Sequence, residues 1–315
     1  MTEAAPYARL TPDLVLDAVS ACGLWPDGRL LALNSYENRV WQVGIEDAAP
    51  VIAKFYRPAR WSDAAILEEH AFAQELAGAE LPVVAPLIVG GRSLLHHDGF
   101  RYALTPRKGG RAPALESTDQ LEWLGRLIAR MHTVGSRQAF AHRGAIDRAT
   151  MIAQPSHAVL ASSLLPAHLH QNYRVAVARL DTAVAARQQA VGPVRMLRLH
   201  GDCHPGNLLW TDHGPHFVDL DDARMGPAVQ DLWMLAHDDD AMDALLEGYA
   251  SMRDFDPAER ALVPALRAMR QVHHAGWIAK RWHDPAFPAA FPFVDEPRWW
   301  EQHIVDLHEL ADGLE

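Results

Sequence analysis

The chain has 315 residues, of which 49% are hydrophobic, and a formal net charge of −11. This length predicts about two domains, and the hydrophobic content is ordinary for a soluble globular enzyme. The acidic balance argues against a general nucleic-acid-binding protein, because contacts with phosphates require a basic face.

The cysteines and the first residues bear on location. Cys22 and Cys203 are the only cysteines, lie far apart and lack zinc-site spacing, so no disulfide framework is expected and a reducing cytoplasm fits. Glu3 stands where a signal peptide needs a base, and no apolar run approaches the roughly 18 residues of a membrane span. We predict a cytoplasmic protein, acting as a monomer, with neither a membrane nor a nucleic-acid partner.

The N-terminal third predicts an antiparallel meander with helices around it. One helix begins at Thr11 and ends at Gly23, and a second is capped by Ser62 and stops at Gly78. The strands are expected at residues 30–33, 40–43, 51–56 and on both sides of the Asp98-Gly99 turn.

This pattern breaks at residues 105–110, which are rich in Pro, Gly and basic residues. We place the hinge there, between a β-rich ATP-binding lobe (1–104) and a mostly helical catalytic and substrate-binding lobe (111–315). Only residues 195–220 of the second lobe are expected to be extended. The fold class is therefore α+β with two lobes.

Two helix starts are predicted in the second lobe. Ser117 and Gln120 resemble a capping box, and Asp256 followed by Pro257 opens another helix in the same way. The first of these helices should bury an apolar stripe at helical spacing, which consists of Leu121, Leu124, Ile128 and Met131.

The extended segment carries the strongest chemical signal of the chain. Asp202 follows the apolar strand 196–199, Asn207 precedes the apolar run 208–210, and Asp219 ends a third run at 216–218. Phosphoryl transfer needs a carboxylate to orient and deprotonate the acceptor hydroxyl, and an amide oxygen with a second carboxylate to hold Mg²⁺ against the phosphates of ATP. These three residues therefore predict a phosphoryl-transfer site.

Lys54 is the candidate contact for the α- and β-phosphates. It lies in the middle of a predicted strand, where a charged residue is disfavoured unless it faces solvent or a partner. Glu68 or Glu69 of the following helix could pair with it, and the register favours Glu69. An outward-pointing lysine is the simpler alternative.

Other readings of nearby residues stay open. His200, Cys203 and His204 could bind a metal, although no second pair at zinc spacing accompanies them. Asp221 could add negative field for Mg²⁺, and Asp231 is expected to cap or brace the helix that follows it.

The motifs resemble those of the protein-kinase-like fold in its aminoglycoside-phosphotransferase branch, and more closely the bacterial stress response kinase A family. The resemblance covers nearly the whole chain. It is carried by Asn34-Ser-Tyr-Glu-Asn-Arg-Val40, Val51-x-x-Lys-Phe-Tyr-Arg-Pro58, Glu68-Glu-His70, Pro82-Val-Val-Ala-Pro86, Arg198-Leu-His-Gly-Asp-Cys-His-Pro-Gly-Asn207, Phe217-Val-Asp-Leu-Asp-Asp-Ala-Arg224, Gln230-Asp-Leu-Trp-Met234 and Leu266-Arg-Ala-Met-Arg270.

The resemblance implies ATP- and Mg²⁺-dependent phosphorylation of Ser/Thr hydroxyls in proteins, in a bacterial stress response. It implies Asp202 as the catalytic base, Asn207 and Asp219 as Mg²⁺ ligands, and Ser35 as a loop residue that touches ATP. Whether Ser35 is itself phosphorylated stays open.

Two departures from eukaryotic protein kinases matter. The nucleotide loop has Asn34-Ser35 in place of a glycine-rich motif, and only eleven residues separate Asp219 from Asp231, too few for a long activation segment. The alternative functions are a kinase of small amino alcohols, sugars or antibiotics, and a nucleotide-binding pseudokinase, against which the intact set of site residues argues.

Overall fold

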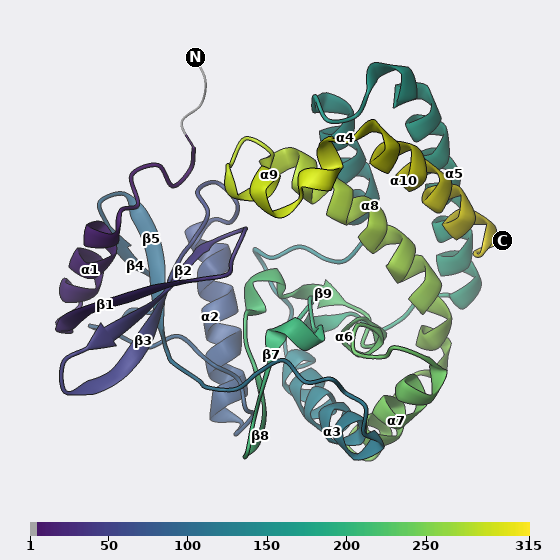
Figure 1. The fold of residues 1–315 in the computed structure, drawn as a ribbon. Helices are drawn as coiled ribbons and strands as arrows, with labels where there is room; N and C mark the ends of the chain where they lie inside the picture. Colours follow the sequence, from purple (N-terminus) through teal and green to yellow (C-terminus); the bar gives the residue numbers. More distant parts are fainter. Residues whose placement is uncertain (1–4) are drawn as a thin grey trace.

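The computed structural model describes residues 5–315, which fold into two lobes joined side by side (Figure 1). The first lobe holds a five-stranded antiparallel sheet in the order β1-β2-β3-β5-β4, and the second is mostly helical. The α+β, two-lobed class predicted from the sequence is therefore confirmed.

The first lobe follows the predicted order. Its elements are α1 (Pro12–Ser20), β1 (Pro26–Leu33), β2 (Arg39–Ile45), β3 (Ala48–Phe55), α2 (Asp63–Gly78), β4 (Leu95–His97) and β5 (Phe100–Pro106). The side chains of Thr11 and Ser62 accept hydrogen bonds from Leu14 and Ala65 at the starts of α1 and α2, as N-caps do. Asp98 and Gly99 both have positive φ, as a two-residue hairpin turn requires.

The sheet packs different partners on its two faces. Phe55 pairs with Tyr102 and both side chains join the core beneath α1. Because side chains alternate along a strand, Lys54 and its pair Ala103 lie on the other face. Ala103 packs there with Ile66 of α2, so Lys54 is directed toward α2 and the second lobe.

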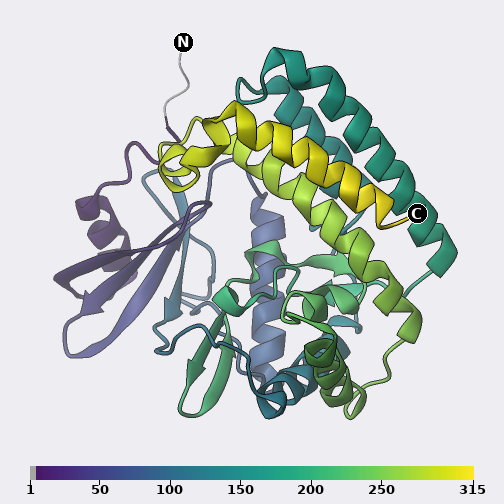
Figure 2. The same cartoon turned by 45° about the vertical axis from the view of Figure 1, so that its right-hand side comes forward.

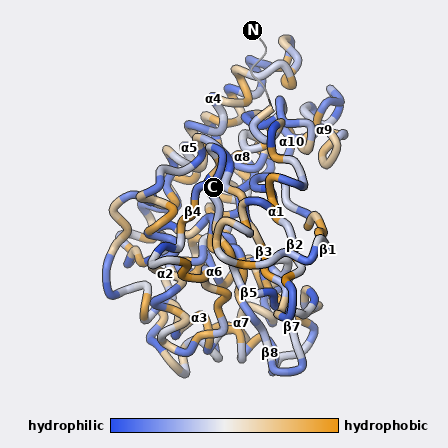
Figure 3. Tube along the Cα trace, turned by 90° about the vertical axis from the view of Figure 1, so that its left-hand side faces the viewer, coloured by the Kyte–Doolittle hydropathy of each residue, from blue (hydrophilic) through white to orange (hydrophobic). Residues whose placement is uncertain are grey.

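The second lobe is a layer of helices around two small sheets. Its helices are α3 (Thr118–Gly135), α4 (Gln154–Ala161), α5 (His170–Val191), α6 (Val229–Trp233), α7 (Asp239–Ala250), α8 (Val263–Arg281), α9 (Ala286–Ala290) and α10 (Pro297–Asp312). Its strands are β6 (Leu197–Leu199), β7 (Leu208–Thr211), β8 (Gly214–Phe217) and β9 (Arg224–Gly226), which pair as β6 with β9 and β7 with β8. Helices α5, α8 and α10 lie side by side in Figure 2, and hydrophobic and hydrophilic stretches alternate along the helices in Figure 3, as one-sided burial requires.

Two details of the predicted helix starts were wrong. Ser117 begins α3, but its side chain makes no capping hydrogen bond; its carbonyl accepts from the amides of Gln120 and Leu121 instead. Asp256 accepts a hydrogen bond from the amide of Ala258, as an N-cap does, but the six residues that follow it (Pro257–Leu262) form a 3₁₀ helix that leads into α8. The predicted apolar stripe of α3 is buried throughout.

Several contacts connect the lobes. Val83, after α2, bridges to Phe217 of β8. Glu75 of α2 accepts two hydrogen bonds from the buried Arg198 of β6. β5 ends inside the predicted hinge at 105–110, and division of the chain at that segment stays a prediction. Within residues 5–315, no helix is long and apolar enough to cross a membrane.

Candidate active site

The loop after β6 is held in place by one buried carboxylate. Asp231 of α6 accepts hydrogen bonds from the amides of His200 (2.8 Å) and Gly201 (2.9 Å), and it contacts Nε2 of His132 at 3.1 Å. Gly201 has φ of +84°, and a Cβ at this position would lie 2.2 Å from the carbonyl oxygen of Asp222. The backbone that presents Asp202 is therefore fixed. Asp231 braces this loop, and no capping hydrogen bond from its side chain to a helix is seen in residues 5–315, although a cap or brace for the following helix was predicted.

Asp202 and Asn207 share the loop. Nδ2 of Asn207 donates to the backbone carbonyl of Asp202 at 2.9 Å and lies 3.4 Å from its carboxylate. The amide nitrogen is thus used within the loop, which leaves the amide oxygen of Asn207 available as a ligand.

Asp219 lies next to this loop. The amide of Val218 donates to the carbonyl of Asn207 at 3.0 Å, and His200 contacts the carbonyl of Val218 at 3.0 Å. Asp219 itself has left-handed backbone angles, φ 61° and ψ 65°, which are uncommon for a residue with a side chain and occur often at functional sites. Its carboxylate is 52% exposed and faces the space between the lobes.

Lys54 connects the first lobe to this group. Its Nζ lies 2.8 Å from Oδ1 of Asp219 and 3.4 Å from Oδ1 of Asp221. Burial alone would lower the pKa of Lys54, but the carboxylates of Asp219 and Asp221 raise it well above its ordinary value. The ammonium therefore stays charged in the site.

The predicted pairing of Lys54 with a glutamate of α2 does not form in this structure. Glu68 accepts hydrogen bonds from the backbone amides of residues 141–143 and is committed there. Glu69 is buried near Lys54, its nearest ion-pair partner is Arg143 at 3.6 Å, and its Oε2 has no hydrogen-bond partner within residues 5–315. The register correctly predicted that Glu69 is the glutamate near Lys54. The ammonium group of Lys54, however, contacts Asp219 and Asp221 instead of Glu69.

Glu69 gives the molecule a pH-dependent stability. Burial raises the pKa of Glu69 to about 7 although Lys54 and Arg143 lower it. The native state then binds the proton more tightly than the unfolded chain, so stability falls as pH rises from about 4.5 to about 7. We expect the wild type to lose on the order of 2 to 3 kcal/mol of unfolding free energy over this pH range through Glu69, and we expect Glu69→Gln not to show this loss.

Urea unfolding at pH 5 and pH 8 measures this effect. The wild type should lose more stability between the two pH values than Glu69→Gln, while the exposed Glu116→Gln should follow the wild type. Parallel curves for wild type and Glu69→Gln would show that Glu69 does not titrate in this window.

Ser35 lies in the turn between β1 and β2. Its Oγ donates to the carbonyl of Asn38 at 3.0 Å, and Asn38, which is buried, donates to Asp221 at 3.0 Å. The turn is therefore anchored to the residues beside Asp219, and Ser35 holds its shape.

The C-terminal part of the second lobe clasps the same turn. Arg57 donates to the carbonyls of Tyr36 (3.0 Å) and Glu37 (2.9 Å) and to the buried Asp284 (2.6 Å). The ring of Tyr36 packs against Phe291, next to α9, which lies beside the first lobe in Figures 1 and 2.

Sequence reasoning offered Asp221 only as a source of negative field for Mg²⁺ and gave Arg270 no role in the site. Asp221 is buried and contacts Lys54, Arg60 and Asn38; burial raises its pKa, but Arg60 and Lys54 lower it to about 2 overall. The sequence signal for a role of Asp221 in the site is its position two residues after Asp219. Arg270 of α8 ends one of the motifs that carry the family resemblance, Leu266-Arg-Ala-Met-Arg270, but that motif gave it no role in the site.

Arg270 binds one carboxylate oxygen of Asp202, the predicted base. Its Nη1 lies 2.7 Å from Oδ1 of Asp202, and Nε2 of His204 lies 3.4 Å from Oδ2. Burial raises the pKa of Asp202, but the hydrogen bond from His204 and the charge of Arg270 outweigh it and the pKa is lowered. Asp202 is thus an ionised carboxylate, able to accept a proton once a hydroxyl reaches it.

The alternative metal cluster does not assemble. His200 contacts the carbonyl of Val218, His204 accepts from the amide of Gly206, and burial raises the pKa of the Cys203 thiol. In the part of the chain that the structure describes, no three His, Cys, Asp or Glu side chains are grouped to hold a metal ion. The amide oxygen of Asn207 and the carboxylate of Asp219 are donor types that Mg²⁺ prefers, so these two residues would hold Mg²⁺ with the phosphates of ATP.

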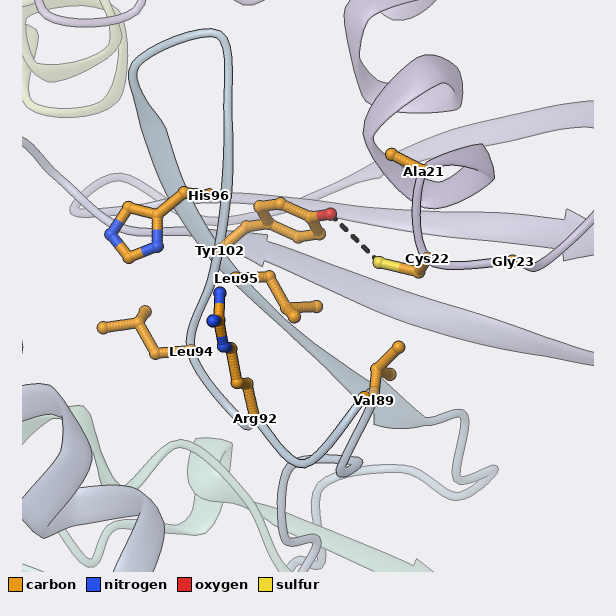
Figure 4. A pocket seen from close by; sticks show the side chains of 10 residues that line it. Ala21, Cys22, Gly23, Val89, Arg92, Leu94, Leu95, His96 and Tyr102 are labelled. Atoms are coloured by element: carbon orange, nitrogen blue, oxygen red, sulfur yellow. Dashed lines mark hydrogen bonds between the residues drawn. The ribbon is translucent and has the colours of Figure 1, made fainter.

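A separate cavity of about 520 Å³ lies behind the sheet (Figure 4). It is lined by the end of α1, the segment before β4 and Tyr102, whose hydroxyl lies 3.0 Å from Sγ of Cys22. Because Tyr102 and Lys54 lie on opposite faces of the sheet, this cavity is not part of the site.

Comparison with known sequences identifies the relatives of this chain. A profile of the phosphotransferase enzyme family matches residues 29–263. Stress response kinase A of Escherichia coli (strain K12) is 43% identical over 314 residues, which cover 98% of this chain and 95% of the relative. The serine/threonine protein kinase RdoA of Salmonella typhimurium (strain LT2) is 42% identical, with 98% and 94% covered.

Solved structures show the same fold at low identity. The amicoumacin kinase in complex with AMP-PNP, Ca²⁺ and Ami has a TM-score of 0.72 and 17% identity, with 96% of this chain and 93% of that chain covered. The microcompartment-associated aminopropanol kinase has a TM-score of 0.69 and 19% identity, with 93% and 98% covered. The chain belongs to the stress response kinase A family, in the aminoglycoside-phosphotransferase-like branch of the protein-kinase-like fold.

Proposed function

We propose that this protein transfers the γ-phosphoryl group of ATP, with Mg²⁺, to Ser/Thr hydroxyls of proteins. The observation that carries the proposal is the convergence of Asp202, Asn207, Asp219 and Lys54 between the two lobes. The protein acceptor is supported by the near full-length relatives named stress response kinase A and serine/threonine protein kinase. We also propose that the protein is a cytoplasmic monomer and that it acts in a stress response.

The proposed roles follow from the geometry. Asp202 is the base that accepts the hydroxyl proton, and Asn207 and Asp219 hold Mg²⁺ against the phosphates. When ATP binds, Lys54 gives up part of its contact with Asp219 and contacts the α- and β-phosphates. Once that contact with Asp219 is weaker, the ammonium group of Lys54 can also approach Glu69. The turn that carries Ser35 covers the phosphates.

The metal role predicts a graded loss of affinity. Asp219→Ala removes a charged ligand and Asn207→Ala a neutral one, so we expect Asp219→Ala to weaken Mg-ATP binding by at least about tenfold, and more than Asn207→Ala. Calorimetric titration with ATP, with and without Mg²⁺, measures both variants. The exposed Asp212→Ala in the β7–β8 turn is the matched control. Unchanged Mg-ATP affinity in both site variants would contradict the metal role.

A small-molecule kinase is the second candidate. It is supported by the structural neighbours, one of which is named an aminopropanol kinase, since the same site chemistry serves either acceptor. Incubation with labelled ATP and Mg²⁺, with either added proteins or a panel of amino alcohols, sugars and aminoglycosides, separates the two. Mass spectrometry should find phosphate on Ser or Thr of the added protein, and the same measurement on the enzyme tests Ser35. Brisk turnover with a small hydroxyl compound and no labelled protein would favour the second candidate.

A further inference from the structure

Helix α8 differs in charge from the rest of this acidic chain. The chain has 40 acidic and 29 basic residues, yet the 19 residues of α8 include four Lys or Arg, two adjacent histidines and no Asp or Glu. This helix runs past the catalytic loop and reaches the clasp on the β1–β2 turn (Figure 1).

One side of α8 faces the site along its length. Residues three and four apart share a side of a helix, and one such stripe consists of Arg267, Arg270, His274, Trp277 and Arg281. At one end of the stripe, Trp277 and Arg281 bind Glu37 of the turn. Toward the other end Arg270 binds Asp202 at 2.7 Å.

Two cations of this stripe remain accessible: Arg270, which contacts Asp202, and Arg267, which lies one helical turn before Arg270. The side chain of Arg270 is 40% exposed, and Arg267 is exposed with its guanidinium 5.6 Å from the ring centroid of Trp233. Arg267 forms no ion pair with any residue from 5 to 315. The approach to the base is thus lined by guanidinium groups, which suit carboxylates because they bind them with two parallel hydrogen bonds.

The acceptor hydroxyl competes with Arg270 for the carboxylate of Asp202. An acceptor hydroxyl has to donate to the Asp202 carboxylate, one oxygen of which Arg270 holds while His204 and Asn207 lie near the other. An acceptor that brings its own carboxylate replaces the partner that Arg270 loses. A cationic acceptor would instead meet two like charges, which costs binding energy.

We propose that the acceptor is a Ser or Thr flanked by acidic residues, with Arg270 and Arg267 as the positioning residues that bind its carboxylates. The inference rests on the proposed protein kinase activity and names its substrate class. It excludes basic Ser/Thr segments and cationic amino alcohols as preferred acceptors.

The test compares serine segments with Asp/Glu, Ala or Lys/Arg flanks, each displayed on the same carrier protein and incubated with the full-length enzyme, Mg²⁺ and ATP. The acidic segment should have a kcat/KM at least about tenfold above the basic one, an advantage that added salt reduces. Arg267→Glu should raise KM for the acidic segment about tenfold with a smaller change in kcat, and should narrow or reverse the preference.

Lys280→Glu is the matched control, because it makes the same charge change at an exposed position of α8 outside the stripe, and it should keep the wild-type preference. Phosphorylation without a charge preference, or with a preference for basic flanks, overturns this inference and leaves the protein kinase activity standing. If no carrier is phosphorylated while a small hydroxyl compound is, the proposed function and this inference both fall.

Discussion

Replacement of Asp202 by asparagine is expected to lower the rate of phosphoryl transfer by about 10² to 10⁴ while Mg-ATP affinity stays near that of the wild type. Asparagine keeps the shape of the side chain and an oxygen for Arg270, but it cannot accept the hydroxyl proton. The proposed ATP contacts come from Lys54, Asn207 and Asp219, so nucleotide binding should survive. Single-turnover phosphorylation of a protein acceptor and calorimetry with Mg-ATP measure the two quantities.

The control for this variant is Asp212→Asn, which makes the same chemical change at an exposed position ten residues further along the chain. It should behave as the wild type in both measurements. Wild-type turnover in Asp202→Asn would remove Asp202 from the role of base, and a large loss of Mg-ATP affinity would place it among the nucleotide contacts instead.

Features with local signals were predictable from the sequence. The caps at Thr11 and Ser62 and the Asp98-Gly99 turn act within a few residues, so their patterns alone locate α1, α2 and the β4–β5 hairpin. The same holds for the core of the site, because Asp202, Asn207 and Asp219 lie within one short run of strands and loops. The capping box at Ser117 shows the limit, since the residues are present but the backbone carbonyl does the capping.

Pairings between distant segments were not predictable in this way. Lys54 is 165 residues from Asp219 in sequence, and Arg270 is 68 residues from Asp202. The choice of Asp219 and Asp221 over Glu69 depends on how α2 packs against the second lobe, which no local periodicity specifies. The same holds for the tail after α8, whose Asp284 and Phe291 contact residues of the first lobe that are more than 200 positions earlier in the chain.

The clasp between Asp284 and the first lobe combines buried charges with aromatic packing. Asp284 is 1% exposed and accepts hydrogen bonds from Arg57 at 2.6 Å and from Arg39 at 2.8 and 3.0 Å. Arg57 also lies 5.4 Å from the ring centroid of Phe287. Because Arg57 holds the carbonyls of the β1–β2 turn, this cluster couples the end of the chain to the loop proposed to cover the phosphates.

Asp284→Ala should therefore lower both stability and nucleotide affinity. Loss of the carboxylate leaves the buried Arg57 with Glu37, at 3.0 Å, as its remaining ion-pair partner. Removal of one member of a buried ion pair costs about 3 to 5 kcal/mol when the other charge is left unpaired, so we expect a loss at the lower end of that range. We expect a lower urea midpoint together with weaker Mg-ATP binding, because the turn loses its anchor. Asp284→Asn, which keeps one acceptor oxygen for the two arginines, should show a smaller loss of both. Asp295→Ala alters an exposed aspartate of the same tail and should leave both near wild type. If Asp284→Ala costs no more stability than Asp295→Ala, the cluster does not hold the lobes together; if stability falls but Mg-ATP affinity does not, the turn keeps its shape without the clasp.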